Sequence, residues 1–158
     1  VAAAPGIDPS FYEAYTSNGH GTVVLFDQTY RILSQADAAL VTSGTATLET
    51  ALLNVPQVVC YRTAAPRITY WVFKHFLHTP YISLVNLVCG REVVKELFAK
   101  FFTVENIRAE LYRILKEPSY RENMLIRYAE LRWIMGEPGA SDRAAEIIQR
   151  FSYKLTIA

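Results

Sequence analysis

Short apolar runs alternate with segments of helical spacing along the chain up to Phe102. The apolar runs, rich in β-branched and aromatic residues, predict buried strands at residues 1–4, 22–26, 38–42, 57–61 and 81–84. The segments of helical spacing predict helices at residues 9–17, 27–35, 45–53, 68–78 and 90–100. Strands and helices that alternate with short connections favour an α/β fold with a Rossmann-like parallel sheet covered on both faces.

From Thr103 onward the pattern is helical, which predicts a helical C-terminal extension. Thr103 is a capping residue ahead of the first of these helices, and Pro118 separates that helix from the next. We therefore divide the chain into a Rossmann-like part at residues 1–102 and the C-terminal helices of the same domain at residues 103–158.

The last of these helices is amphipathic and is predicted at residues 143–154, after a break at Gly136–Asp142. Ile147, Ile148 and Phe151 share one stripe of this helix. An apolar stripe needs a partner, so one arrangement we expect is a homodimer formed through the C-terminal helices.

The stretch from Ala38 to Glu49 combines a buried strand, a tight turn and the start of a helix. The turn Ser43-Gly44-Thr45 provides a glycine, which lets a ligand approach the main chain, and a residue that can cap the helix. Unpaired amide groups at the start of a helix suit a phosphate. Glu49, one turn into the helix, can accept hydrogen bonds from sugar hydroxyls. The alternative is a simple strand-to-helix connection.

Ligands of parallel α/β sheets bind at the carboxyl ends of the strands. The predicted ends here are Phe26-Asp27, Thr42-Ser43-Gly44 and Tyr61-Arg62, and they line one edge of the sheet. Asn86 is expected at the end of a further short strand, where asparagine usually caps or turns the chain.

Composition excludes several classes of protein. Of the 158 residues 51% are hydrophobic and 20% are charged, which indicates a globular chain. The formal net charge of +1 gives no field that would attract nucleic acid. Cys60 and Cys89 lie in apolar runs without metal-like spacing and are expected to be free thiols in a reducing cytoplasm. No signal peptide and no apolar run of membrane-spanning length is visible.

The predicted helix at residues 68–78 is apolar almost all round. Either it is a core helix with extended Lys and Arg side chains, or it is a surface that meets lipid or an acyl chain through Trp and Tyr. His75 and His78 are three residues apart, but no nearby Asp, Glu or Cys completes a metal site.

Three ordered motifs resemble one family. They are Ser-Gly-Thr-Ala-x-Leu-Glu at residues 43–49, a strand ending in Tyr61-Arg62, and Ser-Leu-x-Asn-Leu-x-x-Gly-Arg-Glu at residues 83–92. Together they resemble lipid-A-disaccharide synthase, an inverting glycosyltransferase of the two-domain GT-B fold. The resemblance runs from about Val1 to about Ala144.

The resemblance implies the C-terminal half of a GT-B fold and a reaction that needs no metal. UDP-2,3-diacylglucosamine transfers its sugar to 2,3-diacylglucosamine 1-phosphate, a β-1,6-linked disaccharide forms, and UDP leaves. The amides of Ser43, Gly44, Thr45 and Ala46 are expected to stabilise the diphosphate together with a basic side chain, and the carboxylate of Glu49 is expected to hold the ribose. Arg62 is expected among the residues that bind the UDP-sugar.

Further roles follow from the resemblance. The main chain near Phe26 is expected to face uracil, and Asn86 is expected to be important for catalysis. Arg91 either binds the diphosphate or forms a surface pair with Glu92 or Glu96. The location expected for such an enzyme is the cytoplasm, peripheral to the inner face of the cytoplasmic membrane.

A strand that begins at Val1 has no element before it, so we expect a domain truncated at its start. The resemblance then places a first strand, an N-terminal domain and the general base upstream, and the piece alone is expected to be inactive. Two alternatives stay open. One is another UDP-sugar glycosyltransferase of the GT-B fold, and the other is a non-catalytic nucleotide-sugar-binding or assembly domain.

Overall fold

A three-stranded parallel sheet lies at the centre of the molecule. The computed structural model describes residues 1–16, 21–42, 44–64 and 80–156, with side chains through Gln149. Within these ranges the strands β1 (Ala39–Val41), β2 (Gln57–Tyr61) and β3 (Lys95–Phe98) pair in the order β1-β2-β3. Val41 lies opposite Val59, which in turn lies opposite Glu96. The α/β class and the parallel sheet are confirmed.

The central strand β2 is covered on both faces. Gln57, Val58, Val59 and Cys60 are all buried, and successive side chains of a strand point to opposite faces. Helix α3 (Gly44–Leu52) contacts β1 and β2, whereas helix α6 (Val104–Lys116) contacts β2 and β3. The sequence places β-branched and apolar side chains on β2 because neither of its faces meets water.

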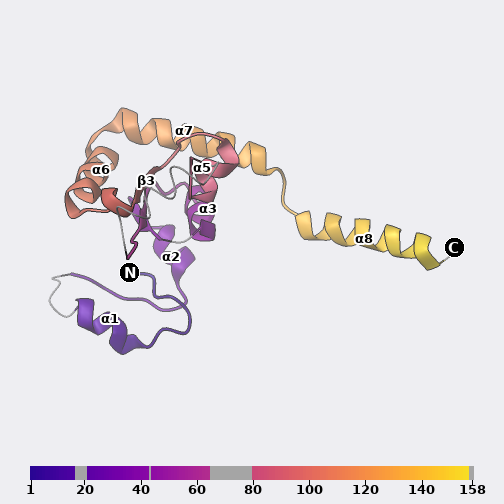
Figure 1. Cartoon of the computed structure of the whole chain (residues 1–158), viewed down its shortest axis with the longest axis horizontal. Helices are drawn as coiled ribbons and strands as arrows, with labels where there is room; N and C mark the ends of the chain where they lie inside the picture. The colour runs from indigo at the N-terminus through magenta and orange to yellow at the C-terminus, as the bar shows by residue number, and fades with distance from the viewer. Residues whose placement is uncertain (17–20, 43, 65–79, 157–158) are drawn as a thin grey trace.

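Helix α7 (Pro118–Met135) closes the core by packing against α3, α5 (Leu84–Cys89) and α6 (Figure 1). It contributes Met124, Tyr128 and Leu131 to one buried cluster that also contains residues of the sheet and of α3, α5 and α6. As predicted, Thr103 caps α6 by accepting a hydrogen bond from the Asn106 amide, and Pro118 opens α7.

Two predicted elements between residues 81 and 101 are wrong. The strand predicted at 81–84 is replaced by the short helix α5 (Leu84–Cys89), and the helix predicted at 90–100 is replaced by β3 and a 3-10 turn (Ala99–Phe101). Ser83 caps α5, and Gly90 ends it with a φ of 63°, a left-handed conformation that favours glycine. The chain then passes through Val93 and Val94 and enters the third strand at Lys95.

The N-terminal segment is less regular than predicted. Helix α1 (Pro9–Thr16) is present, but the strands expected at 1–4 and 22–26 are reduced to one isolated bridge between Ala2 and Leu25. The second helix is shortened to α2 (Thr29–Leu33), because the chain first passes through a positive φ of 54° at Asp27.

The strand β1 also differs from its prediction. Leu40 is 51% exposed, so this strand is not covered on both faces. Within the described sheet β1 lies at an edge, and α3 covers only one side of it.

The last helix, α8 (Ala140–Thr156), extends away from the rest of the molecule (Figure 1). It follows a turn in which Gly136 and Gly139 have φ values of 73° and 94°. Ile147 and Ile148 are exposed, and the side chain of Phe151 lies outside the described part. No helix of the described residues is long and apolar enough to cross a membrane. The helix predicted at 68–78, with its two histidines, lies outside the described residues.

Candidate functional site

The candidate site lies where two helices begin beside the carboxyl ends of the strands. Helix α3 starts at Gly44, three residues after the end of β1, and α5 starts at Leu84. A Cβ atom on Gly44 would lie 3.8 Å from the Leu84 Cγ atom, so the two helix starts are in contact. Because the strands are parallel, the end of β2 at Tyr61 points to this same edge.

The first turn of α3 is partly exposed. Gly44 and Ala46 are half-buried, Thr45 is exposed, and Ser43 lies outside the described residues. Thr47 donates a hydrogen bond of 2.6 Å from its hydroxyl to the Gly44 carbonyl, and the Thr50 hydroxyl donates one of 2.7 Å to Ala46. These two bonds fix the carbonyl side of the turn, while the first amide groups of a helix have no partner within it.

Two charged side chains near this edge are free to meet a ligand. Glu49 is half-buried on α3, and Arg62 is exposed directly after β2. Within the part of the chain that the structure describes, neither side chain makes a hydrogen bond or an ion pair. A half-buried carboxylate without a partner has all its acceptor capacity available, so Glu49 can bind hydroxyl groups.

Phe26 belongs to the N-terminal segment between α1 and α2. Its ring packs edge-on against Tyr12 of α1, with the ring centroids 5.9 Å apart. Phe26 follows the isolated bridge between Ala2 and Leu25, so it does not lie at a strand end of the three-stranded sheet, where the sequence predicted it.

Asn86 is fully buried, and its amide uses all of its hydrogen-bonding capacity. The Oδ1 atom accepts from the Val93 and Val94 amides at 2.7 and 3.0 Å. The Nδ2 atom donates to the Val94 carbonyl at 2.9 Å and to Glu96 Oε1 at 2.8 Å. The side chain therefore joins α5 to the beginning of β3, and it leaves no polar atom for direct contact with a substrate.

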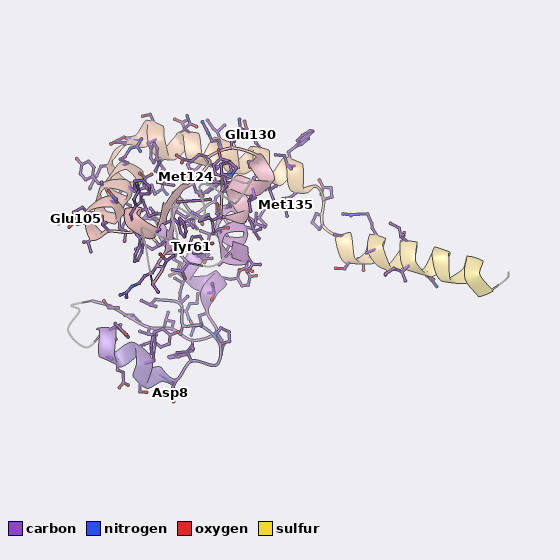
Figure 2. All side chains as sticks on the ribbon, in the orientation of Figure 1. Asp8, Tyr61, Glu105, Met124, Glu130 and Met135 are labelled. Carbon is purple, nitrogen blue, oxygen red and sulfur yellow. The ribbon has the colours of Figure 1, made fainter. Side chains whose placement is uncertain are left out.

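The carboxylate of Glu96 is a site residue that the sequence analysis missed. Its Oε1 atom accepts from the Ser83 amide at 2.9 Å and the Ser83 hydroxyl at 2.6 Å, in addition to Asn86. Its Oε2 atom accepts from the Ile82 amide at 2.9 Å. Burial and then the charge of Glu96 raise the pKa of Tyr61, which lies at the end of β2 (Figure 2).

The available signal for Glu96 was its pattern with Phe98, two residues later in the same strand. In a strand, residues two apart share a face, so a glutamate in such a run faces the helices that cover the sheet. Because a helix was predicted at residues 90–100, Glu96 was interpreted as a solvent-facing residue.

Arg91 lies at the other end of α5. It follows Gly90, which ends the helix, whereas Ser83 and the candidate site are at the start of the helix. Its guanidinium group donates to the carboxylate of Glu130 on α7, and both side chains are about half exposed. Of the two interpretations of Arg91, the surface ion pair is present, although its partner is neither Glu92 nor Glu96.

A second polar cluster lies at the amino end of β3. The Tyr120 hydroxyl donates to the buried Glu110 carboxylate, and the Arg113 guanidinium lies 3.8 Å from the Tyr120 ring centroid. Burial, followed by the hydrogen bond to Glu110, raises the pKa of Tyr120. The adjoining cavity of about 430 Å³ is lined by charges of both signs that already pair, such as Lys95 with Glu92.

Neither cysteine takes part in these clusters. Cys60 is buried and Cys89 is half-buried, and both are free thiols, as predicted. Burial raises the pKa of each thiol. In the described ranges no three His, Cys, Asp or Glu side chains gather in a group suited to a metal ion.

Comparison with known proteins gives one family. A sequence model of the family described as "Lipid-A-disaccharide synthetase" matches residues 8–148 of this chain. Among curated relatives, the lipid-A-disaccharide synthase of Myxococcus xanthus is 39% identical over 149 residues, which cover 94% of this chain and 38% of the relative.

Two further relatives carry the same name. The lipid-A-disaccharide synthase of Syntrophus aciditrophicus is 40% identical over 125 residues, covering 79% of this chain and 32% of the relative. That of Gloeothece citriformis is 45% identical over 118 residues, covering 73% of this chain and 30% of the relative. The chain thus spans about a third of the length of the curated relatives it matches.

Proposed function

The chain belongs to the lipid-A-disaccharide synthetase family, and from this premise we propose that it is the nucleotide-sugar-binding part of a glycosyltransferase of lipid A biosynthesis. The protein that contains it takes UDP-2,3-diacylglucosamine as donor and 2,3-diacylglucosamine 1-phosphate as acceptor. The products are a β-1,6-linked disaccharide and UDP, with inversion at the anomeric carbon.

One observation carries the proposal: the open first turn of α3 with the unpaired carboxylate of Glu49 one turn behind it. Helix α3 begins with a glycine, so a diphosphate can approach the Gly44, Thr45 and Ala46 amides closely. Glu49 accepts hydrogen bonds from the ribose hydroxyls. The main chain near Phe26 faces the uracil ring.

The chemical role of this chain in the reaction is to stabilise the leaving group. As the bond to the sugar breaks, negative charge develops on the diphosphate of UDP. Oriented amides at the helix start and the guanidinium group of Arg62 stabilise that negative charge, because they already point toward it before the bond breaks. The general base that takes the acceptor's proton belongs to the part of the protein outside this chain.

The experiment is a transfer assay on the full-length gene product with both lipid substrates, with the products identified by mass spectrometry. A disaccharide 1-phosphate and an equal amount of UDP are expected. Transfer from the same donor to a different acceptor would favour another glycosyltransferase of the GT-B fold. Binding of UDP without any transfer would favour a non-catalytic nucleotide-sugar-binding domain.

The ribose contact is tested by calorimetry with UDP on the variant Glu49→Gln. Loss of the charged acceptor should weaken UDP binding by about 10-fold, since hydrogen bonds to charged groups contribute about 1.5–3 kcal/mol. The matched control is Glu122→Gln, an exposed glutamate on α7. Equal UDP affinity for wild type and Glu49→Gln would remove Glu49 from the site.

The same proposal includes the location of the protein. Its lipid substrates place it in the cytoplasm, peripheral to the inner face of the cytoplasmic membrane. Fractionation of cells should find it with membranes and release it at high salt, without detergent.

A further inference from the structure

The start of α5 is held by one carboxylate on the neighbouring strand. Glu96 on β3 accepts four hydrogen bonds, from the Ile82 and Ser83 amides, the Ser83 hydroxyl and the Asn86 side chain, all between 2.6 and 2.9 Å. Ser83 and Asn86 are fully buried, so water cannot replace Glu96 as their acceptor.

These contacts form a chain that ends at the candidate site. The Ser83 hydroxyl donates to Glu96 and accepts a 3.3 Å hydrogen bond from the Asn86 amide, which caps α5. Leu84, the next residue, contacts the start of α3 at Gly44. The position of Glu96 on the sheet therefore fixes how the first turn of α5 lies against the first turn of α3.

The four partners require a carboxylate at this place. Every one of them is an N–H or O–H donor, and an ionised carboxylate has two oxygen atoms that only accept. A glutamine has the same shape but offers one acceptor atom and an NH₂ group. That NH₂ group would face either the Ile82 amide or the three donors of Ser83 and Asn86, so at least one donor would lose its partner.

We propose that Glu96 is a positioning residue for sugar transfer: through Ser83 and Asn86 it holds the start of α5 against the diphosphate-binding turn of α3. This inference rests on the proposed function, because it assigns Glu96 to the same site. Glu96 does not touch the substrate. It acts by keeping the Leu84 side chain beside Gly44, so that the diphosphate-binding turn has the geometry that the transition state needs.

The test is the variant Glu96→Gln in the full-length gene product, with kcat, KM and the dissociation constant of UDP measured on the folded fraction. We expect kcat to fall by about 10- to 100-fold, as for buried donors left unpaired. UDP affinity should stay within about twofold, since its contacts belong to α3 and Arg62. The matched control is Glu92→Gln, an exposed glutamate of the same segment, which should keep the wild-type kcat.

Two further variants separate positioning from a general loss of stability. Ser83→Ala removes one of the four donors to Glu96 together with the cap of α5, leaves the carboxylate in place, and should give a smaller fall in kcat than Glu96→Gln. In a double-mutant cycle, Glu96→Gln and Asn86→Ala should together cost no more than the larger single loss, because both act through one network.

Three outcomes would overturn the inference. They are a wild-type kcat per folded molecule in Glu96→Gln, losses that add fully in the double mutant, and an equal loss of kcat in Glu92→Gln. Each of these leaves the proposed function standing, provided that the wild-type protein transfers the sugar. A wild-type protein without transferase activity would overturn the proposed function and this inference together.

Discussion

At the scale of single residues, burial separates side chains that hold the fold from those that can meet a ligand. Asn86 is fully buried, and its side-chain amide uses all of its hydrogen-bonding capacity on Val93, Val94 and Glu96. Glu49 is half-buried and has no partner in the described part of the chain. Both are polar residues beside one sheet edge, yet the first contributes by fixing main-chain positions and the second by its free acceptor atoms.

The variant Asn86→Ala should lower the free energy of unfolding by about 3 kcal/mol, because it leaves the buried Val93 and Val94 amides without an acceptor. Urea denaturation of wild type and variant measures this difference. Asn123→Ala is the control, since Asn123 is exposed on α7 and its change should cost less than about 0.5 kcal/mol. Equal costs for the two variants would show that the buried amide is not needed for stability.

Tyr128 should make the fold sensitive to alkali. Burial raises the pKa of its hydroxyl, and its ring is fully buried. An unfolded tyrosine ionises near pH 10, at about its reference value. Because the pKa is higher in the folded state, this contribution to stability is complete below about pH 10 and is lost as the pH rises toward the folded-state pKa.

Tyr128→Phe should therefore reduce the loss of stability between about pH 10 and 12, measured by urea midpoints across that range. Tyr112→Phe is the matched control, because the Tyr112 ring is 63% exposed on α6. If Tyr128→Phe and wild type lose stability in parallel, the alkaline transition has another origin.

At the scale of elements, the order and approximate boundaries of the elements in segment 38–61 could be predicted from the sequence, although not the exposure of β1, and those of segment 81–101 could not. In the first, a glycine after a valine-containing strand and a proline before the next strand mark the boundaries of β1, α3 and β2. In the second, the apolar run is equally consistent with a strand and with a buried helix. The choice depends on long-range partners of Asn86 and Glu96, which no local pattern reveals.

The candidate site divides in the same way. Gly44, Thr45, Ala46 and Glu49 could be predicted together because their relative positions follow from the geometry of one helix. The place of Arg91 depended on the element that follows Gly90. Gly90 is left-handed and ends α5, and a strand follows in place of the expected helix. Arg91 therefore lies beside Glu130 of α7.

Gly90→Ala should destabilise the protein by about 1 kcal/mol, because a left-handed conformation is unfavourable for any residue with a Cβ atom. Nothing lies within 4 Å of the position of that Cβ, so the cost is conformational rather than a clash. Thermal unfolding measures it, and Gly90→Asn should recover part of the loss.

Gly44→Ala is the control for the fold. Gly44 has no positive φ, and the added Cβ would meet only the Leu84 side chain at an ordinary contact distance. Its melting temperature should stay close to that of wild type. A larger loss in Gly44→Ala than in Gly90→Ala would contradict the conformational argument.

At the scale of the whole molecule, the apolar surface near the C-terminus has no cover within the described structure. Trp133, close to Met135 at the end of α7, is 85% exposed, and the turn at Gly136 then leads into the projecting α8 (Figure 2). Ile147 and Ile148 are 55% and 66% exposed on α8. Leaving apolar surface in water costs about 25 cal/mol for each Å², so we propose that two copies cover these side chains by pairing through their C-terminal helices.

Light scattering of this chain over a concentration series should show a mass that rises from one copy to two. Ile148→Ser should weaken the association, because it removes a large apolar side chain from the exposed stripe of α8. Gln149→Ser, a polar exchange at the adjacent exposed position, should leave the association as in wild type. A monomer mass at every concentration, with the α8 amides protected from hydrogen exchange, would mean that α8 packs on its own copy. In that case the dimer proposal fails, and protection of Trp133 from solvent, read by its fluorescence, would show where α8 lies.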